Sequence, residues 1–225
     1  MIVAAGDERR SPQPHRLTMK DITVIYKRGA VGLARQLFGH RPADDDLARL
    51  AGAMDGATVI VSANRKKNWL YLFVSDPRFD RYETSVRRDA DSRLFAYIHH
   101  VYVAAGHTGQ GYGLRAFLRQ VNGARRLGLK RFELFAAGYS GSDDEIGYYV
   151  WARYGFDARL RDEEQATLPA PLKGSTNLNQ LILSGGRAWW KRFGNARSMS
   201  FDLADGSEMM NVFRSYLKEQ GITEE

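Results

Sequence analysis

The chain has 225 residues, of which 44% are hydrophobic and 26% are charged, and this composition excludes a largely disordered or collagen-like protein. It has no cysteine, which excludes disulfides, thiolate metal sites and cysteine nucleophiles. The 33 Lys and Arg residues outnumber the 26 Asp and Glu residues, so the net charge is +7. A positive surface favours partners that carry phosphate or carboxylate groups, without choosing among them.

The start of the sequence predicts no folded element. Residues 1–17 carry prolines and an arginine pair but no periodic apolar face, so we expect a flexible tail there. They also lack the basic-then-apolar order of a secretory signal. No stretch approaches the roughly 20 apolar residues that span a bilayer. We therefore expect a soluble, cytoplasmic protein.

The first half of the chain predicts one strand, two helices and then four strands. Residues 22–26 are β-rich, and apolar residues at helical spacing predict helices from Ala30 to Phe38 and from Asp44 to Met54. Apolar residues then alternate with polar ones, which predicts the strands Ala57–Ser62, Trp69–Val74, Tyr82–Arg88 and Arg93–Val103.

The second half alternates helices and strands. The expected elements are a helix at Tyr112–Arg126, a strand at Arg131–Ala136, a helix at Asp143–Tyr154 with Ser142 as its N-cap, a strand at Ser198–Leu203 and a helix at Ser207–Glu219. Residues 160–185 are polar and contain two prolines, so we expect irregular structure there. This order predicts a mixed α/β sheet with helices on both faces.

A glycine-rich segment carries the chemistry. The strand that ends at Val103 runs into Gly106, Gly109, Gly111 and Gly113, and these open the next helix. Glycines let the backbone turn tightly and approach a ligand, and a helix N-terminus offers unpaired N–H groups and a partial positive charge. The segment is therefore suited to a pyrophosphate.

Two other nucleotide motifs fit this segment less well. A P-loop requires a lysine after its glycines, and none follows here. A dinucleotide fingerprint requires Gly-x-Gly-x-x-Gly, but Leu114 stands at the last glycine position. That fingerprint also follows the first strand of its fold, and here several strands precede it.

The segment resembles the acetyl-CoA signature of the GNAT (GCN5-related N-acetyltransferase) superfamily. Val103 holds the strand-end position, and Gly111 and Gly113 hold the two glycine positions. Thr108 stands where the family has Arg or Gln, which is a departure. Downstream, Gly155-Phe156 matches the last-helix signature, with Trp151 at the usual Tyr position.

The resemblance covers roughly residues 20–160 and implies an organisation of the chain. It implies a mostly antiparallel mixed sheet in an acyl-CoA-binding core at residues 18–160, with residues 161–225 as a C-terminal, helical extension packed on it. It also implies acetyl-CoA or CoA as cofactor. The residues expected to bind it are Val101, Tyr102, Val103, Thr108, Gly109, Gln110, Gly111, Tyr112 and Gly113. Arg115, Arg119 and the pair Arg125-Arg126 either neutralise CoA phosphates or form a solvated helix face.

The resemblance also implies the catalytic groups. Strand alternation places Tyr97, His99, Val101 and Val103 on one face, and Ile98, His100 and Tyr102 on the other. Tyr97 falls where some family members have a catalytic Glu, and His99 has an ordinary pKa near 6.5, within range for a base. Tyr149, or its neighbour Tyr148, is the expected general acid. Asp143-Asp144-Glu145 is interpreted as a helix-start charge cluster, and no metal site is assigned.

These features predict an N-acetyltransferase that moves an acetyl group from acetyl-CoA to a primary amine by direct attack in a ternary complex. The acceptor options are a small amine, a peptide, a lysine or aminoacyl-tRNA, with RNA contact through the basic surface and no membrane partner. The alternative is an inactive module of the same fold that binds nucleic acid or a protein, with the changes at Thr108 and Trp151 marking lost chemistry.

Overall fold

The computed structural model describes residues 21–141 and 146–223. The expected tail at residues 1–17, the Ser142 cap and the charge cluster at residues 143–145 lie outside these ranges. The strands are β1 (Thr23–Tyr26), β2 (Thr58–Asn64), β3 (Trp69–Asp76), β4 (Phe79–Arg88), β5 (Leu94–Val103), β6 (Arg131–Tyr139) and β7 (Asn195–Asp202). The α-helices are α1 (Ala30–Phe38), α2 (Asp44–Ala51), α3 (Tyr112–Arg126), α4 (Gly147–Arg153), α5 (Asp162–Thr167), α6 (Leu178–Leu183), α7 (Arg187–Phe193) and α8 (Glu208–Glu219).

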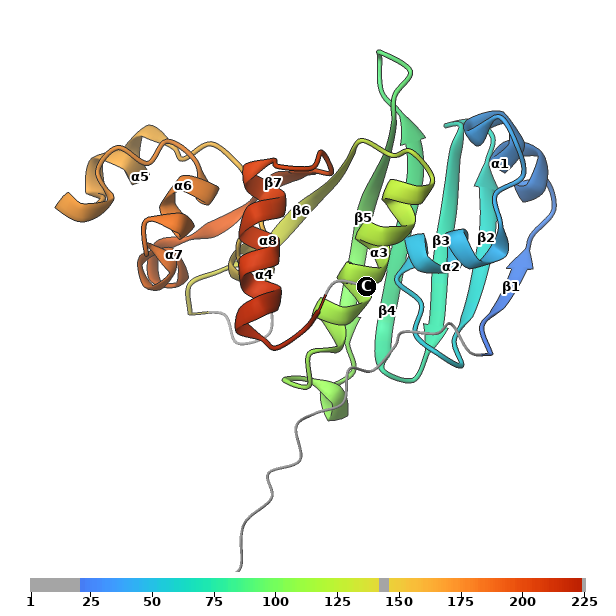
Figure 1. Ribbon diagram of the computed structural model, residues 1–225, viewed down its shortest axis with the longest axis horizontal. Coiled ribbons are helices and arrows are strands. Elements are labelled where there is room, and N and C mark those ends of the chain that lie inside the picture. Colours follow the sequence, from blue (N-terminus) through green and yellow to red (C-terminus); the bar gives the residue numbers. More distant parts are fainter. Residues whose placement is uncertain (1–20, 142–145, 224–225) are drawn as a thin grey trace, which may run out of the picture.

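The seven strands form one sheet in the order of the sequence (Figure 1). The pairs β1–β2 and β5–β6 are parallel, and the other four pairs are antiparallel. The predicted mixed, mostly antiparallel sheet is therefore confirmed. The last strand, β7, comes from the C-terminal segment that we expected to pack on the core, so this segment extends the sheet itself.

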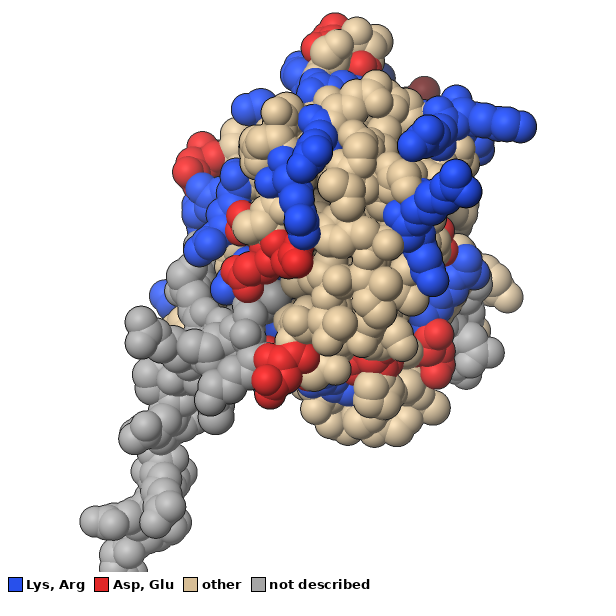
Figure 2. Space-filling model, turned by 90° about the vertical axis from the view of Figure 1, so that its right-hand side faces the viewer, with Lys and Arg blue, Asp and Glu red and all other residues tan. Residues whose placement is uncertain are grey.

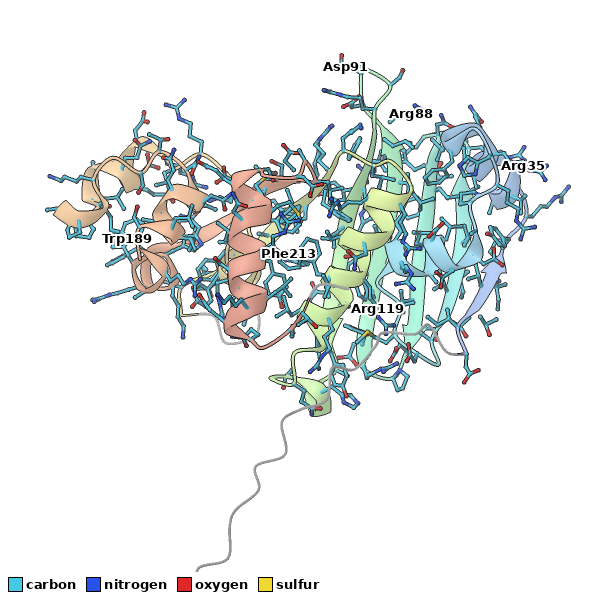
Figure 3. The ribbon with its side chains drawn as sticks, in the orientation of Figure 1. Arg35, Arg88, Asp91, Arg119, Trp189 and Phe213 are labelled. Carbon is cyan, nitrogen blue, oxygen red and sulfur yellow. The ribbon has the colours of Figure 1, made fainter. Side chains whose placement is uncertain are left out.

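Three helices, α3, α4 and α8, pack around a cluster of aromatic rings. Phe117 of α3 contacts Phe132 of β6, Trp151 of α4 and Phe213 of α8, with ring centroids 5.1 to 5.7 Å apart. Phe213 projects from α8, which runs beside α3 in Figure 3. Because one ring of α3 contacts β6, α4 and α8 together, these helices cover the same face of the sheet.

The N-terminal helices share that face, which differs from the expected helices on both faces. Gly123 of α3 lies so close to α2 that a Cβ there would stand 2.3 Å from the Leu50 nitrogen. The buried Gln120 amide also donates a hydrogen bond to the Leu50 carbonyl (3.0 Å). Close backbone packing of α2 on α3 therefore holds both helices on the same face, and Figure 1 shows α1, α2 and α3 in front of the strands.

Two expectations for the second half of the chain are wrong. Residues 160–185 contain the helices α5 and α6 and a short 3₁₀ turn at Ala170–Leu172. The side chain of Asn177 accepts a hydrogen bond from the Gln180 N–H and caps α6. The expectation of irregular structure rested on the prolines of this segment and not on this capping residue. Helix α4 starts at Gly147 and not at residue 143, and a Cβ on Gly147 would stand 2.9 Å from the Ala137 carbonyl oxygen.

Within the described residues, no helix is both long and apolar enough to cross a membrane.

Candidate functional site

Strands β5 and β6 part in the middle of the sheet. Their parallel register runs from Phe95 opposite Arg131 to Ile98 opposite Leu134 and then stops. Beyond Ile98, β5 stays paired with β4 as far as Val103, which lies opposite Phe79. Within residues 21–141 and 146–223, the β6-facing edge of β5 after Ile98 therefore has no strand partner and can accept a ligand.

A β-bulge lies where the strands part. Ile98 and His100 of β5 face the consecutive residues Thr84 and Glu83 of β4, so His99 is the extra residue. Such an insertion moves every later side chain to the opposite face of the sheet.

The bulge overturns the predicted alternation of side chains along β5. Ile98 is buried in the core, and Val101 and Val103 pack against the same core. They lie three and five residues after Ile98. In a regular strand only residues an even number of positions apart share a face, so the bulge accounts for this placement. The ring of His100 stacks on Tyr102 (5.9 Å) and lies 6.5 Å from His99. His100 and Tyr102 are therefore on the face of His99, whereas Val101 and Val103 are not.

The loop after β5 presents free backbone N–H groups. In the described part of the chain, the amides of six consecutive residues, Gly109 to Leu114, have no recorded hydrogen-bond acceptor. Gly109 and Gly111 have φ angles of 75°, in the left-handed region that glycine adopts without strain. The two glycines thus turn the chain so that these N–H groups surround the N-terminus of α3, the arrangement that binds anions.

The side chains of this loop stabilise the loop itself. The Thr108 hydroxyl donates to the Ala105 carbonyl (3.0 Å), and the Gln110 amide donates to the Gly106 carbonyl (3.0 Å). The ring of Tyr112 meets His107 edge-on at 5.5 Å. Thr108 therefore keeps the loop in shape although it cannot replace the long side chain of the Arg or Gln it substitutes.

Of the four arginines considered for phosphate binding, Arg115 lies at the loop, where its guanidinium donates to the Gln110 carbonyl (2.9 Å). Arg119 is buried and joins α3 to the Ala53 carbonyl and to Asp55 (Figure 3). Arg125 pairs with Asp205, and Arg126 pairs with Asp46. Arg115 is thus the arginine of this set that remains a phosphate candidate.

The His99 imidazole is held by two neighbours on β4. Its Nε2 lies 3.1 Å from the Arg87 guanidinium and 3.0 Å from the Ser85 hydroxyl. A guanidinium can only donate, so Nε2 accepts and the ring proton is on Nδ1. Burial first, and then the charge of Arg87, lower the pKa of His99 to about 4. His99 is therefore neutral at pH 7 and a much weaker base than its ordinary pKa predicts.

Neighbours of His99 complete this part of the site. The Tyr97 ring packs 4.9 Å from the His99 ring. Glu83, opposite His100 at the bulge, is largely buried and pairs with Arg81 (2.9 Å). Sequence reasoning missed Glu83 because its strand is separated from β5 in the sequence and only the pairing register brings it to the bulge.

The predicted tyrosines of α4 face the C-terminal helices. The Tyr148 hydroxyl donates to the Lys191 carbonyl (2.7 Å), and the Tyr149 ring lies under the charges of Arg153 and Lys191. Neither has a recorded contact with the glycine loop. Trp151 packs on Phe117 and Phe156 in the core.

Tyr154, one residue past α4, reaches the loop instead. Its hydroxyl lies 3.6 Å from the point where a Cβ on Gly113 would stand, and that point is also 3.7 Å from Val103. Burial raises the pKa of Tyr154 above its ordinary value, so the hydroxyl keeps its proton at neutral pH. The signal was present in the sequence, since Tyr154 directly precedes Gly155-Phe156.

Searches against known proteins return similarities among solved structures. The chain is similar to yncA of Salmonella typhimurium, assigned as an acetyltransferase and solved with its cofactor acetyl-CoA, at 16% identity over 64% of this chain and 69% of that chain, with a TM-score of 0.32. It is similar to an acetyltransferase of the GNAT family from Staphylococcus aureus Mu50 at 10% identity over 80% of this chain and 97% of that chain, with a TM-score of 0.34. No family model and no curated protein matches. At these identities and TM-scores, the similarities carry no argument about the activity of this chain.

Proposed function

We propose that this chain transfers an acetyl group from acetyl-CoA to a primary amine. The observation that carries the proposal is the sequence of features along one strand: β5 separates from β6, bulges, and then leads into six free amides at the start of α3. Free amides at a helix N-terminus fit a diphosphate, and an unpaired strand edge fits the amide groups of a pantetheine arm.

Acetyl-CoA would supply an activated acyl group as a thioester. In the transfer, the amine nitrogen forms a bond to the carbonyl carbon while the carbon–sulfur bond breaks. The amine gives up one proton and the departing sulfur takes one, so the products are an amide and the CoA thiol. Donors on the open edge of β5 would stabilise the charge that develops on the carbonyl oxygen.

We propose candidate residues for both proton transfers. Tyr154 keeps its proton at neutral pH and lies beside Val103 and Gly113, so we propose it as the donor to the sulfur in place of Tyr149. His99 and Tyr97 stay predictions as acceptors of the amine proton. We add Glu83, since it is the carboxylate at the bulge and can act directly or through water.

Thermal unfolding with and without acetyl-CoA tests the cofactor. A ligand at 100 times its dissociation constant stabilises the folded state by about 2.7 kcal/mol, which raises the melting temperature by several degrees. Gly111→Val should abolish this shift, because a β-branched residue is strained at the φ angle of 75°. Gly106→Ala is the matched control in the same loop, since a Cβ there meets nothing within 4 Å and its φ is not positive.

The alternative, a binding module without transfer activity, is favoured by one observation. Figure 2 shows Lys and Arg side chains on both sides of the surface at the β1 end of the molecule. Among the described residues at this end, six cations have no carboxylate partner: Lys27, Arg28, Arg35, Arg65, Lys66 and Lys67. RNA binding with a steep salt dependence, together with no shift from acetyl-CoA, would select the alternative.

A further inference from the structure

The face of the sheet opposite the helices carries a chain of aromatic rings. Trp69, Tyr71 and Phe73 alternate along β3 with residues that are buried in the core, and the Tyr71 ring packs on His99 of β5 (5.4 Å). In the residues that the structure describes, no ring or hydrogen-bond contact joins these side chains to a helix. The ring-bearing side chains are partly exposed, so a ligand can reach this face from β3 across to β5.

Arg87 of β4 lies in the middle of this face and is fixed on both sides. Its guanidinium carbon is 3.6 Å from the centre of the Trp69 ring and 4.4 Å from the centre of the Tyr97 ring. Its Nε donates to the Ser85 hydroxyl (2.9 Å), and its Nη2 contacts His99. An arginine held between two rings has lost most of its freedom before any ligand arrives.

The charge of Arg87 has no carboxylate partner in the described part of the chain. Two other arginines on the same face do have one, because Arg81 pairs with Glu83 and Arg131 pairs with Glu133. A guanidinium has five N–H groups, and for Arg87 two have recorded partners. Partial burial lowers the pKa of Arg87, whereas the charges of Tyr71, Tyr97 and Glu133 act to raise it. Its three other N–H groups are free to bind a ligand.

The guanidinium of Arg87 lies close to the proposed reaction site. It contacts His99, the bulged residue, which directly follows the last residue of β5 that pairs with β6. Val101, two residues further along the open edge, is roughly 7 Å from His99 at the usual rise of a strand. A ligand that places its anionic group on Arg87 and its amine at the open edge would therefore need several bonds between these two groups.

We propose that the acceptor is a small amine that also carries a carboxylate, that Arg87 binds this carboxylate, and that the amine is several bonds away from it. This inference rests on the proposed transferase function. Arginine is suited to the task because its planar fork matches both oxygens of a carboxylate. Ser85 and His99 orient the guanidinium, and Trp69 and Tyr97 hold it between their rings.

The test compares 6-aminohexanoate with 6-aminohexanamide, which differ only in the carboxylate. With acetyl-CoA, the wild type should acetylate the acid with a kcat/KM at least about tenfold higher than that of the amide. Arg87→Gln should remove this preference, so that the ratio of the two kcat/KM values approaches one. Arg93→Gln is the matched control, since it removes the same charge from the β4–β5 turn, where Arg93 pairs with Asp89 and Asp91. Equal rates for the two compounds in the wild type would overturn the proposal.

Binding of 6-aminohexanoate without acetyl-CoA, followed by NMR, separates this inference from the transferase function. Perturbation of the Trp69 and Tyr97 signals in the wild type, and its loss in Arg87→Gln with an unchanged melting temperature, would support the carboxylate site even if no transfer occurs. Binding that persists in Arg87→Gln would overturn the assignment. Arg87→Lys keeps the charge but not the fork, so it should restore only a small part of the preference.

Discussion

The side chains of Arg87 and His99 form a direct hydrogen bond between adjacent strands, with 3.1 Å between Nη2 and Nε2. Because arginine only donates, this bond fixes His99 in the neutral form with its proton on Nδ1. The same bond orients the guanidinium toward the open face of the sheet. This pair therefore determines both the protonation state of His99 and the orientation of the Arg87 guanidinium.

The folded protein should lose stability between pH 6.5 and pH 4 because of His99. Its pKa is about 4 when folded and near 6.5 when unfolded, so the unfolded chain binds more protons in this window and stability rises with pH. The full shift would be worth about 3 kcal/mol, which solvent access reduces to about 1–2 kcal/mol.

The measurement is urea unfolding of the wild type and His99→Gln at several pH values. The difference between the two free energies of unfolding should change by about 1–2 kcal/mol from pH 7 to pH 4. His40, which is exposed and contacts only the Arg41 carbonyl, gives the control variant His40→Gln. Parallel pH curves for the wild type and His99→Gln would refute the assigned shift.

Replacing Gly123 should destabilise the packing of α2 on α3. In Gly123→Ala the new Cβ would stand 2.3 Å from the Leu50 nitrogen and 2.8 Å from the Arg49 carbonyl carbon, and both are backbone atoms that cannot rotate away. We expect a loss of about 2–3 kcal/mol in denaturant unfolding. Gly32→Ala in α1 is the control, because a Cβ there meets nothing within 4 Å and alanine favours a helix by about 1 kcal/mol. A Gly123→Ala protein as stable as Gly32→Ala would contradict this packing.

The elements with strong local signals could be predicted from the sequence. Helices α1 and α3 begin and end where their apolar spacing places them, and the strand that leads into the glycine loop was located to within one residue. The bulge at His99 could not be predicted, because it depends on the register against β4. The place of α2 could not be predicted either, since it depends on a close approach to Gly123, and a single glycine in a helix does not indicate such packing.

Among the candidate site residues, the backbone groups were easier to predict than the side chains. Glycine spacing located the free amides, because glycine marks positions that require a positive φ. The resemblance implies a Tyr of the last helix as the acid, which favours Tyr149. Tyr154 follows that helix, and its hydroxyl ends beside Gly113, which the sequence alone does not show.

The Tyr154→Phe variant should lower kcat about 100-fold in an acetyl-transfer assay while the KM for acetyl-CoA stays within a few-fold, since a general acid contributes to the chemical step. Tyr149→Phe is the matched control and should keep near wild-type rates. Both variants keep the ring, so the stacking of residue 154 on Phe117 and Tyr216 should persist. A larger effect of Tyr149→Phe would return the acid role to Tyr149.

Glu164 and Arg197 form a buried ion pair between α5 and β7, and both side chains are more than nine-tenths buried. Arg197 also lies against the ring of Trp190 (4.5 Å), so it cannot turn to solvent without leaving the core. Glu164→Gln should cost about 3–5 kcal/mol because it leaves a buried guanidinium without its anion.

Urea unfolding checks this prediction through the midpoint concentration, with an unchanged slope as evidence that the fold is retained. The double variant Glu164→Leu with Arg197→Met removes both charges and should recover most of the loss, because a buried pair costs much of its attraction in desolvation. Asp162→Asn, in the same first turn of α5, is the control and should stay within about 0.5 kcal/mol of the wild type. If the double variant were as unstable as Glu164→Gln, the loss would come from packing rather than from the unpaired charge.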